Sequence, residues 1–90
     1  MKRIVLKYRT ELPGGVGRIP VGPSSKILDI QVQQNFITFW VEHDSEEIPT
    51  GERKFVAVPT GVEFEAEGLG FLRTVQVGSF VWHIYERSIS

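Results

Sequence analysis

Apolar and polar residues alternate with a period of two along most of this chain. Between Lys2 and Arg9, the apolar side chains of Ile4, Leu6 and Tyr8 fall on one side of an extended backbone, and the other side is mainly basic. An alternation of this kind is typical of a strand with one face buried. We therefore expect a half-buried strand here.

The segment from Lys26 to Gln33 alternates in the same way, and its apolar side is formed by Leu28, Ile30 and Val32. Gln34-Asn35 follows, and asparagine tolerates the positive φ that a tight hairpin turn requires. The returning strand, Phe36 to Glu42, is apolar on both sides. Such a strand is central in its sheet, or one of its faces meets a partner.

Four further strands are predicted in the second half of the chain. Arg53 to Val58 is mostly apolar, and Val62 to Gly70 alternates apolar residues with glutamates. The last twenty residues indicate two strands folded back on Gly78-Ser79, with glycine at the first central position of the turn.

Two segments interrupt the pattern. Residues 10–25 are rich in glycine and proline, which predicts a loop with a short edge strand between Val16 and Val21. Its glycines do not form a phosphate-binding loop, because no helix follows them. His43 to Glu52 is polar and acidic, and we expect a solvated loop there.

These elements predict an all-β fold, namely a small antiparallel sandwich or partly open barrel of about six or seven strands that ends in a C-terminal hairpin. Ninety residues are enough for one domain, so residues 1–90 are expected to form a single β domain. The chain has no cysteine, which excludes disulfides and thiolate metal sites. A domain this small gains stability from association, which favours a homo-oligomer.

Charge is distributed unevenly along the sequence. Residues 1–26 carry six Lys or Arg and one acidic residue, Glu11, whereas residues 29–67 carry nine Asp or Glu against Arg53 and Lys54. This asymmetry indicates either a mixed surface built from both segments or chains that dock head to tail. The sequence pI near 6.1 gives no reason to expect general nucleic-acid binding. The apolar run at the N-terminus is too short for an export signal or a membrane span, so a cytoplasmic location is expected.

No cluster of residues predicts catalysis. His43 lies among acidic residues, but the spacing matches no metal-binding loop, and we expect neither a metal nor a cofactor. His83 lies on the last strand, and the hydroxyls of Thr38, Thr60, Thr74 and Ser79 could reach it only if the fold brings them close. A non-enzymatic protein is therefore favoured.

Binding is the better-supported class of function. Trp40, Trp82 and Tyr85, with Phe36, offer flat aromatic surfaces, and cations lie on the neighbouring strands. Aromatic and guanidinium groups together can hold a nucleotide. The candidate ligand-binding residues are Trp40, Arg53, Lys54, Arg73, Trp82, His83 and Tyr85.

Short motifs carry a resemblance that covers nearly the whole chain. They are Lys7-Tyr8, Lys26 to Gln33, Phe39-Trp40, Glu52 to Phe55, Thr60-Gly61, Arg73 to Val75 and Phe80 to Glu86. In these the chain resembles a family of short phage and bacterial accessory proteins of unknown function. It departs from that family in a longer loop from Glu11 to Pro23, and in Phe36 where a glycine commonly completes the turn.

The resemblance implies a protein that binds a host factor or sequesters a host signalling molecule. The first hypothesis is a cytoplasmic homo-oligomer that captures a small nucleotide-like signal and so counters a host defence. The alternatives are a module that binds and inhibits a host enzyme, and a minor structural component of a virion.

Overall fold

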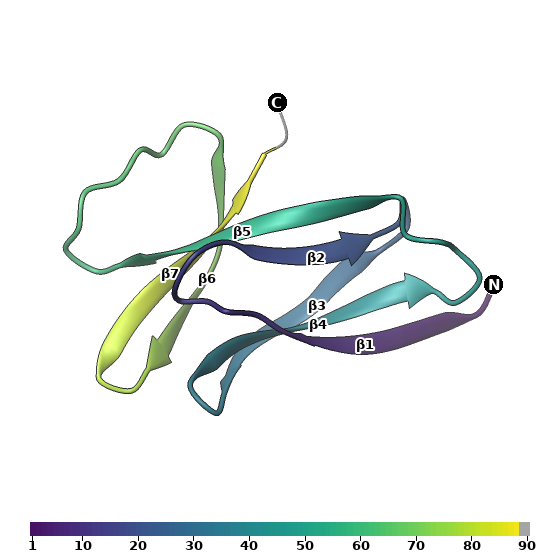
Figure 1. The fold of residues 1–90 in the computed structure, drawn as a ribbon, viewed down its shortest axis with the longest axis horizontal. Coiled ribbons are helices and arrows are strands. Elements are labelled where there is room, and N and C mark those ends of the chain that lie inside the picture. Colours follow the sequence, from purple (N-terminus) through teal and green to yellow (C-terminus); the bar gives the residue numbers. More distant parts are fainter. Residues whose placement is uncertain (89–90) are drawn as a thin grey trace.

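The computed structural model describes residues 1–88 and contains seven strands in two antiparallel sheets (Figure 1). The strands are β1 (Arg3–Arg9), β2 (Gly17–Val21), β3 (Lys26–Gln33), β4 (Phe36–Asp44), β5 (Gly51–Pro59), β6 (Leu69–Val77) and β7 (Phe80–Arg87). One sheet has the order β1-β4-β3 and the other β2-β5-β7-β6. This confirms the all-β sandwich. The described residues include no helix long and apolar enough to cross a membrane.

The core lies between the two sheets. Ile37, Phe39 and Val41 of β4 are fully buried, and the Phe39 ring meets the Phe55 ring of β5 at a centroid distance of 4.6 Å. Ile84 of β7 is also fully buried. Of the two alternatives for the strand after the first hairpin, the central position is confirmed, because β4 pairs with β1 on one side and β3 on the other.

Both predicted hairpins are present. Gln34 and Asn35 adopt φ values of 52° and 69°, and Gly78 adopts 61°. Positive φ at both central residues is the requirement of a type I′ turn, and positive φ at the first of the two suits a type II′ turn. The short strand expected within residues 16–21 is β2.

The first predicted strand is present as β1, but its apolar face is less buried than expected, and of that face Tyr8 packs against the core. Ile4 and Leu6 are 44% and 41% exposed, although they lie on the same face as the buried Val41 and His43. β1 is the edge strand of its sheet, and the facing sheet does not cover it this far out. The strand therefore exposes apolar groups on both faces, since Val5 on the opposite face is 49% exposed.

Two further expectations are corrected. The loop predicted from His43 begins later, because β4 continues to Asp44 and the His43 side chain is only 7% exposed. Residues 62–68 form no strand, and β6 begins at Leu69. The reason is topological: β5 already has β2 and β7 as neighbours, so the segment that follows β5 only connects it to β6 on the far side of β7.

Candidate functional site

Two β-bulges lie across from each other where the sheets meet at the β3 and β6 edges. The register of β3 against β4 shifts between Ile27 and Asp29, and that of β6 against β7 shifts between Phe71 and Arg73. Each bulge inserts one extra residue, which changes the direction of the side chains around it. The extra residues, Leu28 and Leu72, are 49% and 37% exposed.

The first bulge corrects a predicted face. Leu28 was expected to share a side with Ile30 and Val32. Instead, Ile27 packs against the core, and Leu28 turns toward solvent. Two adjacent apolar residues within an alternating pattern, Ile27-Leu28 and Phe71-Leu72, are the sequence signal that could have predicted both bulges.

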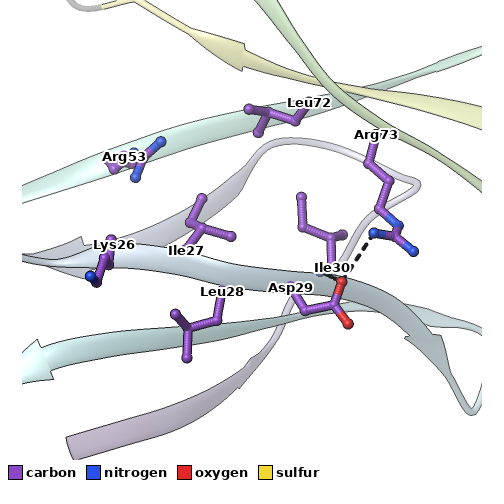
Figure 2. A pocket seen from close by; sticks show the side chains of 8 residues that line it. All are labelled: Lys26, Ile27, Leu28, Asp29, Ile30, Arg53, Leu72 and Arg73. Carbon is purple, nitrogen blue, oxygen red and sulfur yellow. Dashed lines mark hydrogen bonds and ion pairs between the residues drawn. The ribbon is translucent and has the colours of Figure 1, made fainter.

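A groove of about 430 Å³ lies between β3 of one sheet and β5 and β6 of the other (Figure 2). Its apolar lining comes from Ile27, Leu28 and Leu72, and three cationic side chains border it. The lining cations are Lys26, Arg53 and Arg73. The structure thus brings together two residues of the predicted site, Arg53 and Arg73, and adds Lys26, which the sequence reasoning missed.

Arg53 is held in place by Glu86. Its Nε and Nη2 atoms donate to the two carboxylate oxygens of Glu86, with Nε to Oε2 at 2.6 Å. The side chains of Arg53 and Glu86 are each about one quarter exposed. The hydrogen bonds to Glu86 raise the pKa of Arg53. A guanidinium carries five N–H donors in a rigid fork, so the Nη1 donors are left for another acceptor.

Arg73 of β6 is oriented by Asp29, which lies on β3 of the other sheet. Its Nη1 atom lies 3.1 Å from Oδ1 of Asp29, and this contact joins the two sheets. Asp29 also accepts from the Gln31 side chain at 2.6 Å and from the Ile30 amide at 2.9 Å. The hydrogen bonds from Gln31 and Ile30 stabilise the charged carboxylate and lower the pKa of Asp29. The positive charge of Arg73 acts in the same direction.

These contacts predict the effect of two substitutions. Gln31→Ala and Arg73→Gln are each expected to raise the pKa of Asp29 toward its ordinary value, because each removes a group that stabilises the charged carboxylate. Because the folded-state pKa is lowered, the contribution of Asp29 to stability is present above the unfolded pKa and is lost as pH falls through the folded pKa. Titration of the Asp29 carboxyl carbon by NMR measures both pKa values, and a pKa that is unchanged in Gln31→Ala contradicts the role of this hydrogen bond.

The remaining predicted site residues lie elsewhere. Trp40 is on the outer face of the β1-β4-β3 sheet, paired with Lys7 and Asp29. Trp82 is partly buried and packs against the core. Lys54, His83 and Tyr85 lie on the outer face of the other sheet, since they alternate with the inward Phe55 and Ile84. The seven candidates therefore do not form one site.

His83 is held between two hydroxyls. Its Nε2 lies 2.8 Å from Oγ1 of Thr60, and its Nδ1 lies 2.9 Å from Oγ1 of Thr74. Two of the hydroxyls considered from the sequence do reach this imidazole. A general base is ordinarily oriented by a carboxylate or carbonyl, and both ring nitrogens of His83 are engaged by hydroxyls instead. The geometry fits a structural role, in which His83 of β7 links the turn after β5 to β6 by hydrogen bonds.

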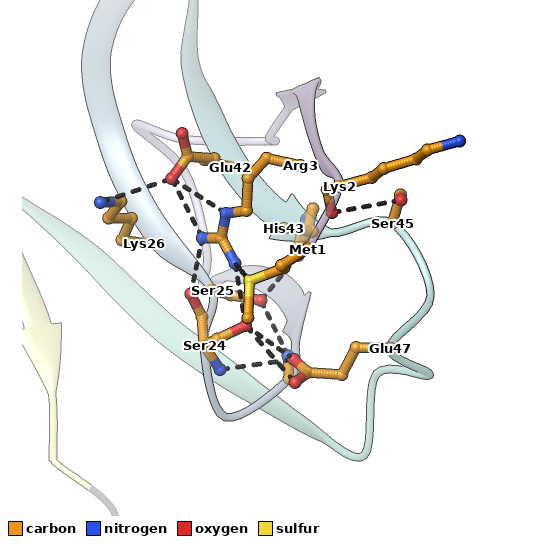
Figure 3. A network of polar contacts seen from close by, with 11 residues as sticks. Met1, Lys2, Arg3, Ser24, Ser25, Lys26, Glu42, His43, Ser45 and Glu47 are labelled. Atoms are coloured by element: carbon orange, nitrogen blue, oxygen red, sulfur yellow. Dashed lines mark hydrogen bonds and ion pairs between the residues drawn. The ribbon is translucent and has the colours of Figure 1, made fainter.

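A second polar network joins the start of β3 to the ends of β1 and β4, and it includes the ion pair of Lys26 with Glu42 at 3.4 Å (Figure 3). Arg3 donates to Glu42 at 3.0 Å and to Ser24, and Ser24 contacts Glu47. Beside it, Nδ1 of His43 lies 2.7 Å from the Ser25 hydroxyl, and its Nε2 lies 2.9 Å from the hydroxyl of Tyr8.

This network fastens the turn before β3 to the end of β4. Every buried side-chain nitrogen and oxygen of the described residues has a hydrogen-bond partner. Burial raises the pKa of Tyr8, so its phenol stays a neutral hydroxyl over a wider pH range. No group of three or more His, Cys, Asp or Glu residues within residues 1–88 is arranged to hold a metal ion.

Comparison with known proteins gives a family and no activity. No curated protein and no solved structure matches the chain. A family model described as a domain of unknown function (DUF7352) matches residues 1–90, the full length of the sequence. The resemblance to a family of unknown function is thereby confirmed, whereas its phage or bacterial origin stays a prediction. The chain belongs to the DUF7352 family.

Proposed function

We propose that this domain binds a small nucleotide-like anion in the groove between β3, β5 and β6, and that it binds without catalysing a reaction. The observation that carries the proposal is the pair of facing bulges, which direct apolar and cationic side chains into one groove of about 430 Å³. Bulges are frequent beside functional sites because they re-aim side chains.

The chemistry of the groove suits a ligand with a phosphate or carboxylate group and an apolar or planar portion. Arg53 and Arg73 are each positioned by a carboxylate and keep unused donors. Because Glu86 and Asp29 balance their charge, the groove favours a ligand that matches the directions of these donors over a generic polyanion. Leu28 and Leu72 provide apolar contact for the rest of the ligand.

The size of the groove agrees with this class of ligand. Small-molecule sites commonly occupy about 300–1,000 Å³ and combine apolar walls with a few placed polar groups. The groove lies at the lower end of that range, which favours a single nucleotide or a compact cyclic one. That such binding counters a host defence follows from the family resemblance alone.

A binding experiment tests this proposal. Thermal shift and calorimetry with a panel of nucleoside monophosphates, cyclic nucleotides and ADP-ribose are expected to identify a ligand. Arg73→Gln is expected to weaken its binding by about 10-fold or more, because a charge-assisted hydrogen bond contributes about 1.5–3 kcal/mol. Arg18→Gln is the matched control, since Arg18 pairs with Glu52 on β2 and does not line the groove.

Two results would contradict the proposal. One is a panel in which no compound shifts the melting temperature. The other is a bound compound whose affinity falls equally in Arg73→Gln and Arg18→Gln, because that result would place the ligand outside the groove.

A further inference from the structure

The free edge of β1 offers an unpaired row of backbone groups. The backbone groups of Lys2 and Thr10 face β4. The amide of Ser45 donates to the carbonyl oxygen of Lys2 at 2.9 Å, and the amide of Thr10 donates to the carbonyl oxygen of Ile37 at 3.2 Å. Bonded and non-bonded pairs alternate along an antiparallel ladder, so the even-numbered residues of β1 bond to β4. The N–H and C=O groups of Arg3, Val5, Lys7 and Arg9 therefore point away from the sheet.

The side chains along this edge are apolar and basic in alternation. Ile4 and Leu6, on the inner face, are 44% and 41% exposed. Lys7 and Arg9, on the outer face, take part in no ion pair among residues 1–88. An exposed edge strand with uncovered apolar groups is a template for a further strand.

Residues 62–67 have the complementary pattern. Val62, Phe64 and Ala66 alternate with Glu63, Glu65 and Glu67, and every residue from 61 to 68 is exposed. Among the described residues, the single turn or loop backbone bond that involves residues 62–67 runs from Leu69 N to Ala66 O. A sequence with strong strand periodicity thus lies outside any strand. Its glutamates are open to solvent, and Phe64 is 43% exposed, with its ring against Tyr85 at a centroid distance of 5.2 Å.

We infer that residues 62–67 of one copy of this chain add to the β1 edge of a second copy as an antiparallel fourth strand. With Phe64 beside Leu6, Lys7 lies opposite Glu63 and Val5 lies opposite Glu65. Apolar side chains then meet on the inner face, and on the outer face the acidic Glu63 meets the basic Lys7. A slip by one residue would place glutamates on the apolar face, so the pattern disfavours every register that differs by an odd number of residues.

A second copy is the occupant that the charges favour. Two β1 edges paired with each other would bring Arg3, Lys7 and Arg9 against a second set of the same cations, which is unfavourable. In Figure 1, β1 and the long loop between β5 and β6 lie at opposite ends of the molecule. The contact is therefore heterologous and joins copies head to tail. This association is independent of ligand binding in the groove.

Two proline variants test the contact. Val5→Pro removes an outward N–H and leaves the ladder to β4 intact, and proline is tolerated on an edge strand in that orientation. Glu65→Pro blocks the donated segment outside every strand of the fold. Thr50→Pro, in an exposed loop outside both elements, is the control.

Light scattering after size exclusion, over a concentration series, gives the readout. The wild type and Thr50→Pro are expected to form species heavier than the 10.2 kDa monomer, whereas Val5→Pro and Glu65→Pro each stay monomeric. An equimolar mixture of the two variants keeps one intact edge and one intact segment, so it should give a 1:1 dimer and nothing larger. Thermal melting of each variant shows that it is folded.

Hydrogen exchange supplies a second measurement. On association, the amides of Val5 and Lys7 should gain protection, while that of Leu6, already bonded to β4, should not change. A wild type that is monomeric at all concentrations overturns the inference. So does self-association that survives both proline substitutions, or a mixture that remains monomeric.

Discussion

Phe55→Ala is expected to destabilise the domain by about 3–5 kcal/mol, the usual cost of removing a fully buried aromatic ring. Phe55 has no exposed surface, and its ring packs on Phe39 across the two sheets. A domain of this size is stable by only about 5–10 kcal/mol, so the loss is a large part of the total. Urea unfolding followed by tryptophan fluorescence measures it.

A milder variant and a matched control complete this test. Phe55→Leu keeps most of the volume and is expected to stay folded with a smaller loss. Phe80→Ala removes the same ring from a position that is 67% exposed, and it should change the free energy of unfolding by no more than about 0.5 kcal/mol. Equal losses at Phe55 and Phe80 would show that Phe55 does not hold the sheets together.

His43→Ala is expected to cost about 2–3 kcal/mol of stability, because it removes a buried ring and leaves two hydroxyls without their partner. The imidazole is 7% exposed and lies between the hydroxyls of Tyr8 and Ser25. The Ser25 hydroxyl also accepts a hydrogen bond from the Gly22 amide at 2.9 Å, so the loss reaches the turn before β3.

His83 provides the comparison for this second test. Its ring also lies between two hydroxyls, at nearly the same distances, but on the more exposed outer face of the other sheet. Water can replace hydrogen bonds lost there, so His83→Ala should cost less than about 1 kcal/mol. Chemical denaturation of both variants measures the loss in the free energy of unfolding. Because each histidine makes two hydrogen bonds, a difference between the two losses reports the effect of burial. An equal cost at the two positions would contradict this explanation.

The strands and turns of this domain are largely readable from the sequence because they depend on local patterns. Each of the seven strands corresponds to a predicted one, and the Gln34-Asn35 and Gly78-Ser79 turns follow from residue type. The failure at residues 62–68 has a different cause. Their periodicity is that of a strand, but both sides of the preceding strand β5 are already occupied, by β2 and β7. Only the topology of the sheet shows this.

The candidate groove was predictable only in part. Arg53 and Arg73 were selected for their charge, but the sequence does not show that Glu86 and Asp29 position them. Lys26 was missed because the residues that make it relevant lie on β5 and β6. His43 was assigned to a solvated loop because its neighbours are acidic, and its burial depends on Tyr8 and Ser25, which are distant in sequence.

The pairing of the strands also affects the order in which the fold can form. β3 with β4 and β6 with β7 are hairpins that can close locally, whereas Arg3 pairs with Asp44 and Gly17 pairs with Phe55. Contacts so distant in sequence slow folding, because a long loop must close before they form. During synthesis, β1 therefore stays without its partner until β4 has left the ribosome. For that interval both of its edges are open, and any strand that binds β1 early competes with the native sheet.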